Sequence, residues 1–388
     1  MEIDVDDIIN GDYDADPIIV RKDKEPEVVH EDVIEEVVVS EVLDINILYE
    51  RLKEGHEKCR DLFVDLRAIT YDISEDDTFI DFHDKSYYKP RLYFKVDLQN
   101  PKDAKVIHAT KQLCKIIGIP YTFFASCRPS LKKNVFKTWQ SGLGDDTKKS
   151  QNVLKIRESK DCTIIRAITS TSKSFIPLYQ IIEMIRDSLG VPVVLSEAFG
   201  DDKDDLVFHA RFLFEKEYDF NGPIQLGFSI TASELDACPL TIDVLLYNKI
   251  TKTYCSALYG GESFFKSDYK GLQSSTLKSM LPHMITRIED EVSEMLSRIE
   301  SKQKSFENSI FCAESEAIEL GKFKGLTSAI KKAIYHEVSE CLDDIKTPWD
   351  LAIHVGLVAK DFEILKRVQI EKAVGVYLNL FFSEGSLS

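Results

Sequence analysis

The chain has 388 residues, a net charge of −17 and 44% hydrophobic residues, a length and composition that predict mostly folded structure in two or three domains. Its eight cysteines are scattered without a CxxC pair, which predicts reduced thiols and excludes a disulfide framework or a zinc knuckle. No secretory signal opens the chain, and no apolar run approaches the roughly 20 residues of a membrane span. We expect a soluble, cytoplasmic protein without membrane contact.

Charge is distributed unevenly along the chain. Residues 1–50 hold 17 Asp/Glu against 3 Lys/Arg, a net of −14, whereas residues 85–160 hold 17 Lys/Arg against 5 Asp/Glu, a net of +12. An acidic arm followed by a basic segment predicts a surface for polyanions together with a tethered competitor for it. The arm is placed at residues 1–44 and is expected to be disordered, because its first 30 residues have few large apolar side chains. Residues 33–43 are apolar enough to dock elsewhere as a short helix or an added strand.

Residues 45–270 are expected to form an α+β core with a mixed or antiparallel sheet and flanking helices. The sequence predicts helices at 45–63, 103–117 and 177–189, with Gly118 and Gly190 as stop signals. Runs rich in β-branched and aromatic residues predict strands at 62–69, 91–96, 121–126, 162–169, 191–196, 206–214, 224–231 and 240–250.

Residues 271–388 have a helical period throughout. Apolar stripes at 281–299 and 326–345 predict the core of a C-terminal helical bundle, with self-association as the alternative use of these faces. Thr347, Pro348 and Asp350 form a helix start, because a hydroxyl cap, a proline and an acid suit the first turn. Two further helices are expected at 350–359 and 364–382.

Catalytic and cofactor motifs are not evident. The sequence contains no GxxxxGK[ST] phosphate loop and no nucleophile elbow. His83 lies between Asp81 and Asp84, and acids also cluster at 201–205, but both stretches are interpreted as solvated turns because further ligands are not apparent. The sequence therefore predicts a non-enzymatic binding protein with no catalytic residues, no metal site and no cofactor.

The basic segment mixes cations with aromatic side chains, the combination that follows phosphates and stacks on bases in single-stranded nucleic acid. Trp139 lies among polar residues and is the expected stacking residue. The alternative is that the aromatic side chains are core and the lysines form an ordinary solvated face. Arg166 is either a phosphate contact or a buried partner of Glu234. The candidate nucleic-acid-binding residues are Lys132, Lys133, Lys137, Trp139, Lys148, Lys149, Lys155, Arg157 and Arg166.

Short segments of the chain resemble, in order and spacing, the landmarks of a phage- and plasmid-borne family described only as domain of unknown function 932. The segments are 116–124, 154–157, 165–170, 227–230, 232–234, 255–261 and 347–351. The chain departs from the family at Ala232, where members often have Asn, and at Tyr259-Gly260-Gly261, where they often have Asn-Gly. The resemblance implies a mobile-element origin, a bacterial host cytoplasm and a role near phage replication or recombination.

Two functional hypotheses follow. The leading one is a phage-type protein that binds or anneals single-stranded nucleic acid and forms homo-oligomers through its C-terminal helices, while the acidic arm occupies the basic groove until a nucleic acid displaces it. The alternative is a structural or host-directed phage protein whose acidic arm docks on a basic protein partner.

Overall fold

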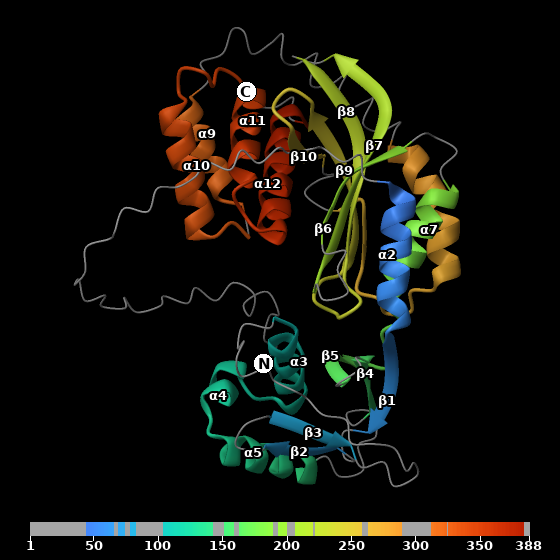
Figure 1. Cartoon of the computed structure of the whole chain (residues 1–388). Helices are drawn as coiled ribbons and strands as arrows, with labels where there is room; N and C mark the ends of the chain where they lie inside the picture. The colour runs from blue at the N-terminus through green and yellow to red at the C-terminus, as the bar shows by residue number, and fades with distance from the viewer. Residues whose placement is uncertain are drawn as a thin grey trace, which may run out of the picture.

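The computed structural model describes residues 44–65, 69–73, 78–82, 104–142, 151–158, 163–188, 193–199, 206–219, 222–257, 263–288, 312–323 and 325–383. The fold is α+β with antiparallel sheets and a helical C-terminal region, as predicted. Except for Asp44, the acidic arm lies outside the described residues, as do the expected strand at 91–96, His83 with Asp84, and the acidic stretch 201–205. Asp81, which was interpreted as part of a turn, lies in a strand paired with Thr70. Figure 1 shows a large sheet flanked by helices and a smaller lobe below it.

The large sheet is antiparallel, with strand order β10-β9-β8-β7-β6 and with β11 paired to β9. Its strands are Val193–Phe199 (β6), Phe208–Asp219 (β7), Pro223–Ala232 (β8), Leu240–Asn248 (β9), Thr253–Ala257 (β10) and Phe265–Ser267 (β11). The first four confirm predicted strands, whereas β10 and β11 were not predicted. Phe212, Phe228 and Val244 are neighbours in register and fully buried, so this row of side chains forms one apolar face.

Helices cover that apolar face, among them a helix at 274–288 and two from the N-terminal half of the chain. The latter two are α2 (Ile45–Glu57) and α7 (Leu178–Ser188), and buried residues of both belong to the same core cluster as Phe212. Asp44 caps α2 by accepting a 2.8 Å hydrogen bond from the Asn46 N–H. The helix predicted at 45–63 was too long, because the chain enters strand β1 (Cys59–Asp65) directly after Lys58.

The C-terminal helices are α9 (Ala313–Gly321), α10 (Ser328–Glu340), α11 (Pro348–Ala359) and α12 (Ile364–Ser383). The predicted helix start is confirmed: Thr347 Oγ1 accepts from the Asp350 N–H at 3.1 Å, and Asp350 Oδ2 accepts from the Thr347 N–H at 2.9 Å. Helix α12 lies on β10, where Gly375 approaches the Ser256 carbonyl so closely that a Cβ would lie 1.4 Å from it.

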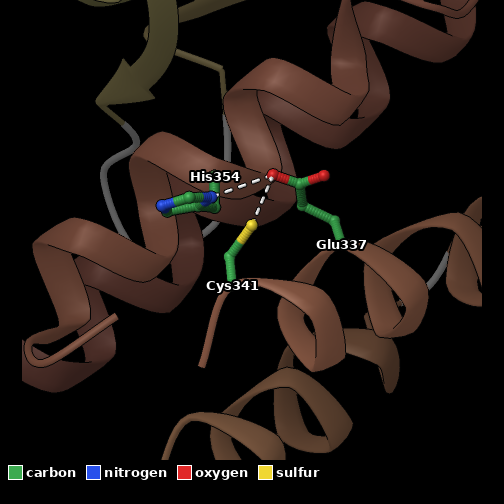
Figure 2. Close-up of side chains that lie close together, drawn as sticks. All are labelled: Glu337, Cys341 and His354. Carbon is green, nitrogen blue, oxygen red and sulfur yellow. Dashed lines mark hydrogen bonds and ion pairs between the residues drawn. The ribbon is translucent and has the colours of Figure 1, made fainter. Parts of the chain in front are cut away.

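Residues on both sides of the predicted boundary at 270/271 belong to one buried core. Ile330 and Trp349 in the C-terminal region belong to one buried cluster with Phe228 and Val244 of the sheet. The stripe of Ile330, Ile334 and Val338 is buried in this cluster, in agreement with the bundle-core interpretation. At the contact between α10 and α11, the side chains of Glu337, Cys341 and His354 point toward one another (Figure 2).

The smaller lobe has its own core, in which three helices pack on the sheet β1-β4-β5. The elements besides β1 are β2 (Ile69–Ile73), β3 (Thr78–Phe82), α3 (Ala104–Ile117), α4 (Tyr121–Ser126), α5 (Pro129–Gly142), β4 (Gln151–Glu158) and β5 (Thr163–Ser170). Helix α3 and strand β5 confirm predictions, and Gly118 ends α3 with a φ of +73°.

The strand predicted at 121–126 was wrong, because this segment is helix α4. A run of six residues rich in aromatics has no period long enough to separate a strand from a helix. Phe124 is buried between residues of α3 and α5, and the segment pairs with no strand of the described part of the chain. Packing of Phe124 therefore decides the local structure. Helix α5 was also not predicted.

Candidate nucleic-acid interface

The helices α3, α4 and α5 form a basic unit. Residues 104–142 contain seven Lys/Arg and no Asp/Glu. Leu113, Phe124 and Phe136 of these helices are buried in the core of the smaller lobe, so their outer sides face solvent. On α3, Lys111 and Lys115 are exposed, and on α5, Lys133 and Lys137 are exposed. Each pair is four residues apart and therefore lies on one side of its helix.

The exposed aromatic side chain of this unit is Phe123 on α4, with 51% of its surface accessible. Beside it in the chain, the half-buried Tyr121 has the Lys111 Nζ 5.4 Å from its ring centroid. Phe124 and Phe136 are 1% exposed and belong to the core. The unit thus presents both cations and a flat ring to solvent, which are the two groups that single strands require.

Trp139 is not the exposed ring that the sequence led us to expect. It is half-buried, packs against the core of the smaller lobe and has its ring 5.6 Å from that of Phe136. Helix α5 places position 139 three residues after Phe136 and hence on the same inward side. Phe123 was missed because the 121–126 segment was interpreted as a strand; a helical period that buries Phe124 turns Phe123 outward.

The predicted site residues do not share one surface in the described part of the chain. Lys132 is half-buried with its Nζ 5.8 Å from the Phe124 ring centroid, while Lys133 and Lys137 are exposed on the same helix. Lys155 and Arg166 are only 7% and 5% exposed, on strands β4 and β5. Lys148, Lys149 and the side chain of Arg157 lie outside the described parts.

Lys155 and Arg166 line a cavity of about 250 Å³ between the smaller lobe and the large one. Lys155 and Asp61 are register partners on β4 and β1, and their side chains form a 2.9 Å ion pair. Arg166 is the extra residue at a register shift in β5, where Ile156 pairs with Ile165 and Lys155 with Ala167. The cavity is lined by His56, Cys59, Arg60, Asp61, Lys155, Arg166, Phe175, Pro177 and Glu234.

Glu234 is a half-buried acid of this cavity. Its Oε1 accepts a 2.7 Å hydrogen bond from the Leu178 N–H at the start of α7. Burial raises the pKa of Glu234, but His56 at 3.8 Å and the Leu178 N–H outweigh burial and leave it below its usual range. The Arg166 guanidinium lowers this pKa as well, and its Nη1 donates to Cys59 Sγ at 3.0 Å. These contacts favour a buried Arg166 beside Glu234 over a surface phosphate contact.

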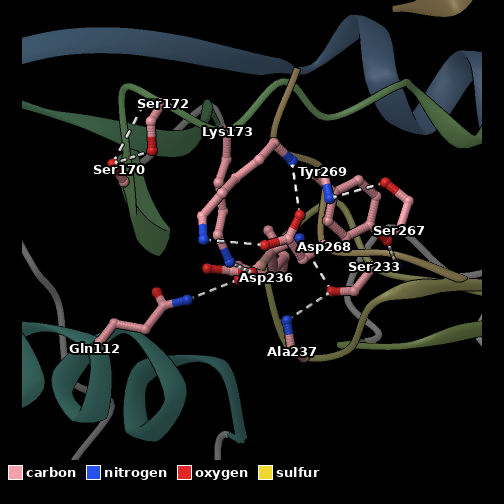
Figure 3. A network of polar contacts seen from close by, with 12 residues as sticks. Gln112, Ser170, Ser172, Lys173, Ser233, Asp236, Ala237, Ser267, Asp268 and Tyr269 are labelled. Carbon is pink, nitrogen blue, oxygen red and sulfur yellow. Dashed lines mark hydrogen bonds and ion pairs between the residues drawn. The ribbon is translucent and has the colours of Figure 1, made fainter. Parts of the chain in front are cut away.

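Direct hydrogen bonds hold the two lobes together beside this cavity (Figure 3). His108 Nε2 and Gln112 Nε2, both on α3, donate to the Leu235 carbonyl at 2.8 Å. Lys173, just after β5, pairs with Asp236 at 2.6 Å. The 233–239 loop of the large sheet therefore fixes the position of α3, and with it the basic helical unit.

Charged side chains are also buried under α12, on the polar face of the large sheet. Arg211 is 0% exposed and donates through Nη2 to both carboxylate oxygens of Glu371 at 2.8 Å and through Nη1 to Glu197 at 2.8 Å. Its Nε donates to His209 at 3.1 Å. Nε, Nη1 and Nη2 of Arg211 all donate to protein groups, so we interpret this array as the tie between α12 and the sheet.

No family model matches the chain, and no curated protein and no solved structure matches it. The resemblance to the family of unknown function therefore stays a prediction. Among the helices in the described ranges, none is both long and apolar enough to cross a membrane.

Proposed function

We propose that the chain binds single-stranded nucleic acid along the exposed side of α3, α4 and α5. The observation that carries this proposal is a unit of three helices with seven cations and no acid, in a chain whose net charge is −17. An ordinary solvated surface would carry acidic residues among these cations, as other parts of the chain do. A surface of one sign attracts a polyanion over long range and binds it through its phosphates.

Exposed side chains on the three neighbouring helices supply the contacts for the proposed nucleic-acid strand. The pair Lys111 and Lys115 on α3 and the pair Lys133 and Lys137 on α5 supply four cations, and Phe123 on α4 supplies a ring for base stacking. Stacking needs an unpaired base, which favours single strands over a duplex. Each cation that neutralises one phosphate contributes about −0.7 to the slope of log affinity against log salt.

The test is a titration of labelled single-stranded and duplex oligonucleotides at several salt concentrations. Wild-type protein should prefer the single strand, with a slope of about −2.8 if the four lysines each engage one phosphate. The variant Lys133→Ala/Lys137→Ala should weaken binding and reduce the slope by about 1.4. The matched variant Lys266→Ala/Lys278→Ala removes two exposed lysines of the large lobe and should leave both quantities unchanged. Binding no tighter than that of serum albumin, or an equal effect of both variants, contradicts the proposal.

The acidic arm supports an autoinhibited form of this function. A tethered polyanion at about millimolar effective concentration competes for a basic surface. Deletion of residues 1–43, which keeps the Asp44 cap of α2, should then strengthen oligonucleotide binding. Unchanged binding would remove the autoinhibition and leave the binding surface in place. Annealing activity and a homo-oligomeric state through the C-terminal helices belong to the same proposal. A place in phage replication or recombination rests on the family resemblance.

The alternative stays a structural or host-directed phage protein that uses the acidic arm to dock on a basic partner. Stoichiometric co-purification of protein partners, together with no oligonucleotide binding, is the result that would favour it.

The cavity between the lobes supports a second candidate function, the binding of a small anion. Arg60, Lys155 and Arg166 outnumber the acids Asp61 and Glu234 around it. Calorimetry with inorganic phosphate and with nucleoside monophosphates tests this function. A Lys155→Met variant should bind either anion more weakly than the wild type, and heat signals equal to buffer dilution in the wild type would exclude the function.

A further inference from the structure

Three side chains of different metal-ligand types meet at the contact of α10 and α11, far from the proposed nucleic-acid surface (Figures 1 and 2). They are Glu337 and Cys341 at the end of α10 and His354 on α11, and their ligand atoms all lie within 4.8 Å of one another. His354 Nδ1 is 2.9 Å from Glu337 Oε1, and Cys341 Sγ is 3.6 Å from the same oxygen.

Local structure places these three groups together. Glu337 and Cys341 are four residues apart and therefore lie on the same side of α10. That side is fixed by Ile334 and Val338, which are 0% and 1% exposed in the main core. The three side chains are half-buried, with 28% of Glu337 and 17% of His354 exposed, so solvent reaches the group from one side.

A carboxylate oxygen, a thiolate sulfur and an imidazole nitrogen are the three ligand types that zinc combines in proteins. Zinc lies about 2.0–2.3 Å from such atoms, so tetrahedral geometry separates neighbouring ligands by about 3.3–3.8 Å. To reach these values, the observed separations of 2.9 and 3.6 Å, and the upper limit of 4.8 Å, must change by about 1.5 Å or less.

The surrounding charge also suits a cation. The carboxylates that act on the Cys341 thiol include those of Glu337, Asp344 and Glu340. A divalent ion at this position would be attracted by all three. His336, by contrast, is exposed on α10 and lies next to Glu340, outside the group of three.

We propose that Glu337, Cys341 and His354 bind one zinc ion, with water in the fourth position. The Cys341 thiol loses its proton to solvent on binding, and the sulfur–zinc bond replaces the sulfur–hydrogen bond without a change in oxidation state. The ion links α10 to α11, and α11 packs against β10, so binding stabilises the bundle against the large sheet. This site is independent of the proposed nucleic-acid function.

The test uses the full chain after removal of metal by a chelator. Titration with Co²⁺ should produce a thiolate-to-cobalt charge-transfer band that saturates at one equivalent, and Zn²⁺ should displace Co²⁺ and raise the melting temperature. Loss of an outer ligand partner already weakens metal sites by about 10–100-fold, so Cys341→Ser and His354→Gln should weaken zinc binding by more than about 100-fold.

Two control variants make the result specific. Cys312→Ser removes the exposed thiol that precedes α9, and His336→Gln removes the exposed imidazole on α10; both should bind metal as the wild type does. Far-ultraviolet circular dichroism establishes that each variant is folded. Absence of a charge-transfer band in the wild type overturns the proposal, as does a band that persists in Cys341→Ser or disappears in Cys312→Ser.

Discussion

Replacement of Glu371 by alanine should strongly destabilise the protein, because it leaves buried cations without their partner. Glu371 is 3% exposed and accepts both 2.8 Å hydrogen bonds from Arg211 Nη2 and a 3.1 Å hydrogen bond from Arg367 Nε. Burial raises the pKa of Glu371, and the two guanidiniums oppose that rise by stabilising its carboxylate. After the substitution, Arg211 keeps its 2.8 Å contact with Glu197, which is itself 31% exposed.

The magnitude follows from the burial of Arg211, which is 0% exposed. Removal of one partner of a buried ion pair costs about 3–5 kcal/mol, most of it the cost of an uncompensated buried charge. Removal of both partners in Arg211→Met/Glu371→Leu should cost less than the sum of the single variants by about 2 kcal/mol or more, since no orphaned charge remains. Arg367 and Glu197 keep their 3.4 Å contact in that double variant.

Urea denaturation of the wild type, Arg211→Met, Glu371→Leu and the double variant measures this coupling, provided that fluorescence and circular dichroism give the same transition. Glu371→Ala is measured in the same way. The exposed pair Lys249 and Glu217 supplies the control, because Lys249→Ala should leave the midpoint unchanged. A cost below about 1 kcal/mol for Glu371→Ala, or strict additivity in the cycle, would refute the account of α12 as tied to the sheet by buried charge.

Three further predictions concern other contacts. Gly375→Ala should cost at least about 3 kcal/mol, the upper end for overpacking, because its Cβ would overlap the backbone oxygen of Ser256; a smaller shift in the urea midpoint would contradict the close approach. Phe123→Ala should weaken single-strand binding by about 1–3 kcal/mol and leave the unfolding midpoint unchanged, as oligonucleotide titration and urea denaturation can decide. Burial, assisted by the Arg211 guanidinium, holds the pKa of His209 well below 6.5, so the unfolded state takes up the proton first and stability falls by up to about 1.4 kcal/mol per pH unit below about pH 6.5. His209→Gln should flatten this part of the stability profile, and an unchanged profile would show that other groups cause it.

The sequence by itself determined those elements whose side chains repeat with a clear period or carry a local stop or start signal. Helix α3 ends at Gly118, as expected from a glycine that adopts a positive φ, and Thr347 with Asp350 starts α11 through hydrogen bonds within four residues. The strands β7, β8 and β9 could be predicted because they are long runs of β-branched and aromatic residues, which favour strands. The structure buries most of these residues. Charge counts likewise identified the basic segment.

Tertiary structure decided what local pattern leaves open. The segment 121–126 is a helix because Phe124 packs between α3 and α5, and the same packing leaves Trp139 half-buried and Phe123 exposed. Lys155 and Arg166 lie apart from the exposed lysines, because the pairing of β4 with β5 and its register shift direct both side chains toward the cavity. A helical spacing of four residues relates Glu337 to Cys341, but only the packing of α11 on α10 brings His354 to them. Local signals act over one helical turn, whereas each of these groupings depends on contacts between residues far apart in the chain.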